Sequence, residues 1–215
     1  MTAETSPSLP LRERKKLRTR QALIDTALDL FGAHGFDGVT LDALCEATEV
    51  SKRTFFRYFG SKEDVAMAPT QDLWTAFLDV LETCPADGRR LLALFEDALA
   101  EAVGRMPADG WAGRVLTSRH LAARTPSMEA HGLAFCDRTT RSALAVVERR
   151  FALPGPDGQL HARLALDLLV ALFHRALDTW VAQPSGHTPE DLVHRLRTTA
   201  AELPSALAAT AEPHA

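Results

Sequence analysis

The sequence has few of the features that mark secreted, membrane-spanning or metal-binding proteins. Its three cysteines, at positions 45, 84 and 136, are an odd number without the spacing of a metal site. No apolar run approaches the roughly 18 residues that a membrane span requires, and the N-terminus is too polar for a secretory signal. We therefore expect a cytoplasmic protein with reduced thiols, no membrane partner and no bound metal.

Motifs of common enzyme classes are missing as well. The chain contains no His-Glu-x-x-His, no Gly-x-Ser-x-Gly and no glycine-rich phosphate loop. Its eight histidines are scattered, and His120 with His131 could supply at most half of a metal site. We predict no catalytic residues and no cofactor. Two alternatives stay open at this level: a helical enzyme whose catalytic groups converge only on folding, and an adaptor that binds only protein.

The charge is unevenly distributed along the chain. The formal net charge is −4, which by itself speaks against a nucleic-acid partner. Residues 11–62, however, contain ten basic and seven acidic side chains, a net of +3, so the rest of the chain carries −7. A basic N-terminal segment attached to an acidic remainder fits a module that contacts phosphates, joined to one that does not.

Strand patterns are almost absent, and the spacing of apolar residues predicts an all-α protein. Apolar residues recur at intervals of three and four, and turns rich in proline and glycine separate these segments. Beyond residue 62 we expect helices near 62–83, 88–104, 109–123, 126–151, 158–183 and 189–209. Pro204 should kink or end the last of them.

The N-terminal part carries the start and stop signals of several short helices. A first helix begins near residue 12 and ends at the glycines around Gly35. Thr40 and Ser51 have the properties of N-caps for a second and a third helix. Ser61 begins a fourth, where Asp64 takes the place of the usual Glu or Gln of a capping box.

The second and third of these helices have the pattern of a helix-turn-helix, with a tight turn at 47–50. The third is too short to be stable alone, so it must be held by packing. The apolar residues spaced to pack it are Leu44, Val50, Phe55 and Phe59. The residues then left facing outward are Lys52, Arg53, Thr54, Phe56 and Arg57.

That outward set has the chemistry that DNA recognition requires. Arginine and lysine reach guanine O6 and N7 or a phosphate, and a threonine methyl can meet the methyl group of thymine. Three positive charges in six residues, beside an exposed aromatic ring, form a surface that suits an anionic partner. The alternative is a packed helical hairpin with a solvated basic face.

The stretch VSKRTFFRYFGSKED at 50–64 resembles the DNA-binding signature of the TetR family of bacterial one-component regulators. ALIDTALDLF at 22–31 and GFDGVTL at 35–41 continue the resemblance, which covers roughly residues 12–66. The resemblance implies base contacts from Lys52, Arg53, Thr54 and Phe56. It implies phosphate contacts from Thr40, Arg57, Tyr58 and Lys62. Ser51, whose hydroxyl begins the third helix, belongs to the same predicted surface.

Two positions depart from the family pattern. Glu49 stands where the turn commonly has glycine; if the backbone there is left-handed, glutamate costs on the order of 1 kcal/mol. A carboxylate at this place would also reduce non-specific affinity for DNA. Phe56 stands where tyrosine is frequent, so an apolar contact with a base or sugar replaces a hydroxyl bond to phosphate.

The remaining helices form a body in which the resemblance implies a small-molecule pocket. Several aromatic residues lie at mid-helix positions and serve either as ordinary core or as the lining of an apolar cavity. His174, among Val170, Phe173 and Leu177, is our candidate for a polar contact. The predicted lining consists of Trp74, Phe77, Phe95, Trp111, Phe135, Phe173, His174 and Trp180.

The last two predicted helices have the pattern of a subunit interface. Segment 158–183 is apolar on more than one face, and segment 189–209 has a stripe of leucine and alanine. As in the family it resembles, we expect these segments to form a four-helix interface of a homodimer. A dimer would place two reading helices about one DNA turn (~34–36 Å) apart, so the operator should be palindromic.

Together these patterns predict an N-terminal three-helix DNA-binding domain followed by a helical ligand-binding and dimerisation domain. The expected boundaries are a flexible arm at 1–11, the helix-turn-helix domain at 12–62 and the body at 63–210. The expected function is a regulator of transcription that binds double-stranded DNA and responds to a small-molecule effector. Repression relieved by an apolar ligand is the function that the resemblance implies; activation by the same fold is the alternative.

Overall fold

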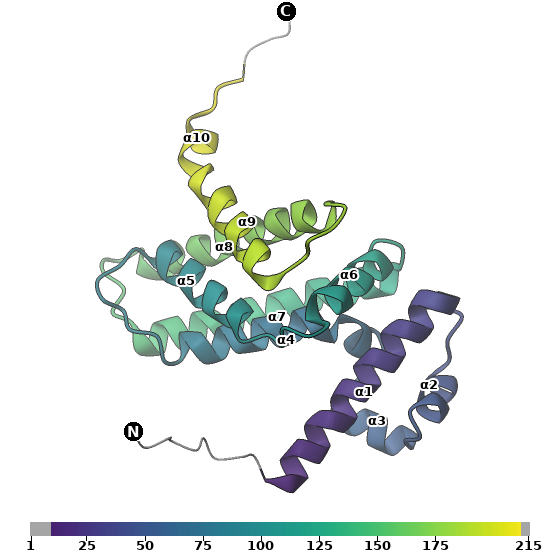
Figure 1. The fold of residues 1–215 in the computed structure, drawn as a ribbon. Helices are drawn as coiled ribbons and strands as arrows, with labels where there is room; N and C mark the ends of the chain where they lie inside the picture. The colour runs from purple at the N-terminus through teal and green to yellow at the C-terminus, as the bar shows by residue number, and fades with distance from the viewer. Residues whose placement is uncertain (1–9, 212–215) are drawn as a thin grey trace, which may run out of the picture. The chain divides into compact units, whose positions relative to one another are not determined.

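The computed structural model describes residues 10–211, and every regular element in this range is a helix (Figure 1). The predicted all-α fold class is therefore confirmed for the described residues. Residues 1–9 of the predicted arm lie outside them, whereas Leu11 is already the first residue of the first helix. The helices are α1 (Leu11–His34), α2 (Leu41–Ala47), α3 (Lys52–Tyr58), α4 (Lys62–Leu81), α5 (Leu91–Gly104), α6 (Trp111–Ala122), α7 (Pro126–Arg150), α8 (Gly158–Val181), α9 (Pro189–Ala201) and α10 (Leu203–Ala208).

The signals in the sequence place most helix ends within three residues of those observed. Gly35 follows α1 with φ +74°, a left-handed conformation that glycine adopts without strain. The hydroxyl of Thr188 accepts a hydrogen bond from the backbone N–H of Asp191 at 3.1 Å and so caps α9. The predicted segment 189–209 is divided at Glu202, where α9 ends and α10 begins, because Pro204 cannot continue the backbone ladder of α9.

The chain folds into two compact units, and α4 contributes residues to both. We call the described residues 10–68, together with His120–His131, the N-terminal unit. We call Pro69–Arg119, together with residues 132–211, the body. The N-terminal unit is thus larger than the predicted segment 12–62, since it includes the first turns of α4 and the corner at which α6 ends and α7 begins.

The core of the N-terminal unit joins α1, α2, α3 and the first turns of α4 to that corner. Phe31, Leu44 and Phe55 are fully buried in it. Leu121 and Met128, which lie on either side of the α6–α7 turn, pack into the same core. Because α2 and α3 have only seven residues each, this packing rather than helix propensity keeps them folded.

The core of the body takes buried side chains from each of the helices α4 to α9, and within it α5, α8 and α9 pack closely against one another. Phe95, Phe173 and Trp180 are buried at its centre. At the end of α7, the guanidinium of Arg150 donates hydrogen bonds to the carbonyl oxygens of Leu81 and Cys84, at 2.5 and 3.0 Å, which ties α7 to the end of α4. None of the described helices combines the length and the apolar character of a membrane span.

Candidate DNA-binding surface

Two hydroxyl groups begin the helices of the predicted helix-turn-helix. The hydroxyl of Thr40 accepts a hydrogen bond from the N–H of Ala43 at 3.1 Å and caps α2. The hydroxyl of Ser51 accepts one from the N–H of Thr54, also at 3.1 Å, and caps α3. Both N-cap predictions are confirmed. Each hydroxyl satisfies a backbone donor that the helix itself leaves unpaired.

The turn between α2 and α3 contains a left-handed residue. Glu49 has φ +53°, and the N–H of Val50 donates to the carbonyl of Cys45 at 3.0 Å to close the turn. The backbone at Glu49 is therefore left-handed, a conformation that only glycine adopts routinely, so glutamate has the expected energetic cost here. The turn is formed at a cost that the packing of α3 must offset.

The faces of α3 separate as the spacing predicts. Phe55 is fully buried and Phe59 is 3% exposed, whereas Phe56 is 54% exposed between them. Lys52, Arg53 and Arg57 are exposed, and Thr54 and Tyr58 are half-buried. The structure thus gathers on one short helix six of the nine residues predicted to bind DNA; Ser51 directly precedes this helix, while Thr40 and Lys62 flank it on α2 and α4.

Lys52 has an acidic partner that sequence reasoning missed. Its ammonium lies 2.7 Å from a carboxylate oxygen of Asp42 on α2, and both side chains are largely exposed. The two residues belong to different helices, so no spacing rule within one helix could have indicated the pair. No acidic side chain among the described residues pairs with the neighbouring Arg53 or with Arg57, whose guanidinium lies 5.2 Å from the centre of the Tyr58 ring.

Lys62 has a structural role in addition to its predicted contact with phosphate. Its ammonium donates hydrogen bonds to the carbonyl oxygens of Phe36 and Val39, at 2.9 and 2.5 Å. It also lies 4.5 Å from the centre of the Phe36 ring. The lysine therefore holds the turn between α1 and α2 against the start of α4.

The start of α4 is capped much as the sequence predicts. The N–H of Asp64 donates to the hydroxyl of Ser61 at 3.2 Å. The carboxylate of Asp64 accepts from the N–H of Gly60 at 2.9 Å, one residue before the usual position in a capping box. His131 at the start of α7 lies 3.4 Å from the other oxygen of Asp64.

Glu63 shares the region where α4 and α7 begin. Burial opposes ionisation of its carboxyl group. Hydrogen bonds from its own backbone N–H and from the hydroxyls of Ser61 and Ser127 nevertheless hold the pKa of Glu63 below its usual value, with a smaller contribution from His131. A negatively charged Glu63 in the first turn of α4 also stabilises the helix through its interaction with the helix dipole.

Six of the eight predicted pocket residues are buried in the body. Trp74 packs edge-on against Phe77 and Phe173, at centroid distances of 5.4 and 5.2 Å, and Trp111 lies 6.5 Å from Trp180. Both remaining residues differ: Phe135 is half-buried and His174 is exposed. Desolvation, followed by the charge of Arg119, still lowers the pKa of His174. The structure therefore gathers the tryptophans and most phenylalanines into packed groups and leaves His174 at the surface.

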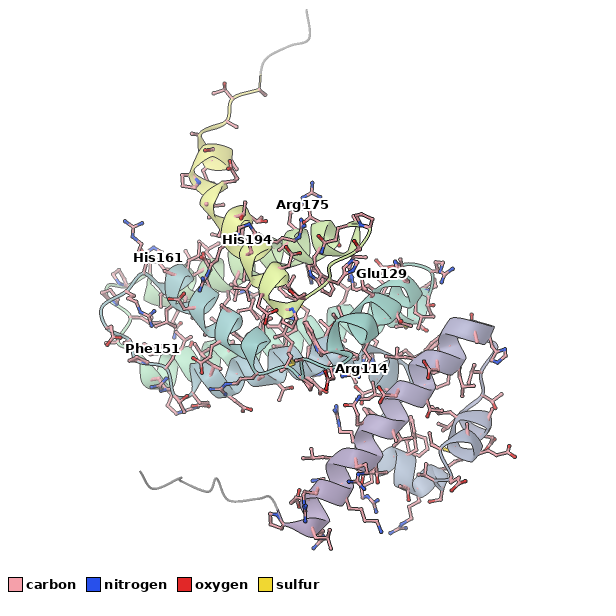
Figure 2. The ribbon with its side chains drawn as sticks, viewed as in Figure 1. Arg114, Glu129, Phe151, His161, Arg175 and His194 are labelled. Carbon is pink, nitrogen blue, oxygen red and sulfur yellow. The ribbon has the colours of Figure 1, made fainter. Side chains whose placement is uncertain are left out.

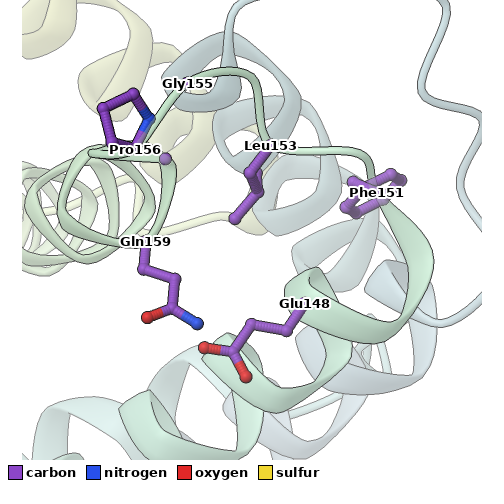
Figure 3. Close-up of a pocket in the computed structure, with 7 residues that line it drawn as sticks. Glu148, Phe151, Leu153, Gly155, Pro156 and Gln159 are labelled. Atoms are coloured by element: carbon purple, nitrogen blue, oxygen red, sulfur yellow. The ribbon is translucent and has the colours of Figure 1, made fainter.

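One cavity of about 350 Å³ lies elsewhere, at the turn between α7 and α8 (Figure 3). The carboxylate of Glu148 and the amide of Gln159 point toward one another across it, and Phe151 and Leu153 form its apolar side. None of the eight predicted pocket residues lines it. Its lining comes from the turn and from the helix ends on either side of it, which the spacing of apolar residues on helices does not reveal.

Comparisons with known proteins match the helix-turn-helix and its flanking helices to bacterial transcriptional regulators. Residues 23–68 match the family model described as bacterial regulatory proteins, tetR family. The chain is 41% identical over 138 residues to the transcriptional regulator TcmR of Streptomyces glaucescens, which covers 61% of this chain and 60% of TcmR. It is 32% identical over 85 residues to the regulator RutR of Escherichia coli, or 40% of each protein. The chain thus matches about three fifths of the length of TcmR and less of RutR.

Solved structures share the fold over most of the chain. A TetR-family regulator from Syntrophomonas wolfei covers 87% of this chain and 95% of its own, with a TM-score of 0.56 and 16% identity. The repressor FadR of Thermus thermophilus, solved in complex with lauroyl-CoA, covers 91% and 98%, with a TM-score of 0.51 and 20% identity. At these identities the similarity is one of fold.

Proposed function

Because residues 23–68 match the tetR family model and the chain resembles TcmR, we propose that it is a TetR-family transcriptional regulator that binds a palindromic operator through α3. The observation that carries this proposal is the outward face of α3, on which exposed cations flank an exposed phenylalanine. Arg53, Lys52, Thr54 and Phe56 contact bases. The phosphate contacts come from Thr40, Arg57, Tyr58 and Lys62, with Ser51 fixing the start of the helix.

The protein acts as a homodimer through 158–183 and 189–209. Leu160 and Leu164, one turn apart on α8, are 55% and 50% exposed in the single chain. Arg175 extends from α8 into solvent along the same helix (Figure 2). Within 189–209, Leu192 and Leu196 are buried inside the subunit, whereas Leu207 of α10 is 77% exposed. The exposed leucines of α8 and α10 form the apolar part of the proposed two-fold interface.

The regulator is a repressor whose operator complex is released by a small apolar effector. The support is that FadR of Thermus thermophilus is a repressor solved with lauroyl-CoA and that AcnR of Corynebacterium efficiens, 37% identical over 54 residues, is a repressor. The effector binds among the buried aromatic residues of the body. Its signal reaches α3 through α4, which both units share, and through the α6–α7 corner, which packs in the core of the N-terminal unit. Only a ligand that favours one of two arrangements can shift their populations.

Selection of binding sites from random DNA with the purified full-length protein tests the DNA-binding proposal. We expect a palindromic site, and recovery of no such site would exclude the proposal. Arg53→Ala should weaken binding and relax base preference at one position of each half-site by about 1–3 kcal/mol. The matched control is Arg138→Ala on α7, an exposed arginine of the body, which should leave affinity and preference unchanged.

Intrinsic fluorescence tests the effector site, because all three tryptophans of the chain, Trp74, Trp111 and Trp180, belong to the predicted pocket. Lauroyl-CoA, dodecanoate and neutral apolar probes are titrated into the protein with and without operator DNA. We expect at least one probe that both changes the tryptophan emission and releases the operator. Probes that release the operator without changing the emission would contradict this site for the effector.

A further inference from the structure

The first two turns of α1 project beyond the core of the N-terminal unit. Leu23 is the first residue of α1 with a buried side chain, and every residue from Leu11 to Arg18 is exposed. Because these turns bury no side chain, the packing of the core does not explain their composition. Six of the nine residues at 12–20 are nevertheless basic, namely Arg12, Arg14, Lys15, Lys16, Arg18 and Arg20.

The first of these charges, Arg12 and Arg14, lie in the first turn of α1, where the backbone dipole disfavours cations. The N-terminus of a helix carries a partial positive charge, so cations there cost stability and anions are favoured. Glu13 is the acidic residue of the first turn, and its carboxylate lies 3.9 Å from Lys16. Within residues 10–211, no acidic side chain pairs with Arg12, Arg14, Lys15 or Arg18. Residues 11–18 therefore carry four cations that have no acidic partner among the described residues, and bound anions would offset their charge.

One stripe of these cations leads away from the C-terminal end of α3. The guanidinium of Arg20 lies 5.0 Å from the centre of the ring of Phe59, the residue at which α3 ends. Lys16 and Arg12 precede Arg20 by four and eight positions, so they lie on the same face of α1. At about 1.5 Å per residue, Arg12 is about 12 Å beyond Arg20, which matches the axial rise of about three to four nucleotides of one DNA strand.

We propose that the projecting turns of α1, residues 11–20, are a second DNA contact that binds the sugar–phosphate backbone beside the half-site read by α3. The inference rests on the proposed function, since it requires that α3 dock on DNA. A membrane surface is the other anionic partner for a basic helix. Leu11 and Leu17, however, are about 120° apart around the helix axis, so the segment lacks the continuous apolar face that an interfacial helix needs.

The test compares the full-length protein with a variant in which five of the basic residues are replaced by glutamine, a residue that preserves helix propensity. The binding constant for the selected operator and for random DNA is measured from 50 to 300 mM salt. The slope of log K against log salt should become shallower by about 2, the equivalent of two phosphate contacts at about 0.9 each. Affinity should fall by the same factor on both DNAs, so that base preference is kept. The substitutions are Arg12→Gln, Arg14→Gln, Lys15→Gln, Lys16→Gln and Arg18→Gln.

A variant with the same change in net charge, placed on the body, is the matched control. Its salt slope should equal that of the wild type, and an equal change in both variants would show that net charge alone acts and would overturn the proposal. Hydrogen exchange gives a second readout: amides at 14–20 should become protected when operator DNA is added, and unchanged exchange there would also overturn it. The control substitutions are Arg89→Gln, Arg105→Gln, Arg138→Gln, Arg141→Gln and Arg149→Gln.

Two further outcomes separate this proposal from its premise. If the wild type binds no DNA in a salt-dependent manner, the proposed function fails and the α1 contact fails with it. If the wild type binds its operator but the five-fold variant keeps the full salt slope, the proposed function stands and the α1 contact is wrong. Loss of binding to vesicles of phosphatidylcholine with 30% phosphatidylserine, alongside an unchanged DNA slope, would assign the segment to a membrane and overturn the proposal.

Discussion

Most arginines of the body have an acidic partner, whereas five arginines of the N-terminal unit have none among the described residues. In the body, exposed arginines repeatedly have acidic neighbours, and four of the ion pairs span one helical turn. These pairs are Arg89–Asp97, Arg105–Glu101, Arg119–Asp178, Arg141–Asp137, Arg163–Asp167 and Arg195–Asp191. In the N-terminal unit, Arg12, Arg14, Arg18, Arg53 and Arg57 have no acidic partner within the described residues.

The difference in ion pairing indicates which surface attracts an anionic partner. An exposed ion pair contributes at most about 1 kcal/mol to stability, so the pairs of the body are a weak source of stability. Their effect is to cancel the field of the cations at short range. The unpaired cations of α1 and α3 keep their field, which attracts phosphate and speeds association.

The largest expected effect separates two adjacent phenylalanines of α3. Phe55→Ala should destabilise the N-terminal unit by about 3–5 kcal/mol, because it leaves a cavity in a fully buried site. Phe56→Ala should change stability by less than about 0.5 kcal/mol while weakening operator binding. Urea unfolding and operator binding, measured on both variants, check this. A similar loss of stability in both would contradict the separation of the two faces.

Lys62→Met should destabilise the protein by about 1.5–3 kcal/mol, since a charged donor is removed from two carbonyl oxygens. Lys52→Met is the matched control, because Lys52 is exposed and its loss should cost less than about 1 kcal/mol of stability. Thermal unfolding of both variants measures the difference. If Lys62→Met leaves the midpoint unchanged and only weakens DNA binding, the lysine acts through phosphate alone.

Glu49→Gly should stabilise the protein by about 1 kcal/mol, because the left-handed backbone at φ +53° is then unstrained. The same substitution at Asp87 of the body, where φ is +49°, should have a similar effect. Glu46→Gly inside α2 is the control and should cost about 0.5–1 kcal/mol. Denaturant midpoints report all three, and a destabilising Glu49→Gly would show that the side chain of Glu49 does more than its backbone costs.

The smallest effect concerns the one ion pair on the reading face, Lys52–Asp42. Asp42→Asn should raise affinity for random DNA by about 3-fold and steepen the salt slope by up to about 0.9, since one more cation becomes available to phosphate. Glu46→Gln, which removes the same charge from α2, serves as the comparison. Equal effects of the two substitutions would show that Asp42 acts through net charge and not through Lys52.

Local signals in the sequence predicted much of what is seen at the surface of the N-terminal unit. The N-caps at Thr40 and Ser51, the exposure of Phe56 beside the buried Phe55, and the left-handed turn at Glu49 all follow from residues within a few positions of one another. The pairing of Lys52 with Asp42 and the hydrogen bonds of Lys62 could not be predicted in this way, because their partners lie on other segments. The roles of these residues on DNA stay predictions.

Helical periodicity and capping are local properties, so the amino-acid sequence alone indicated the helices of residues 10–211, most of their ends and the outward side chains of α3. Tertiary structure decided which unit each segment joins. Leu121 and Met128 lie far along the chain from Leu44, yet they share its core. Likewise, Trp74 packs on Phe173. Such contacts join segments about 80 to 100 residues apart, and they depend on how whole helices pack, which no local pattern encodes.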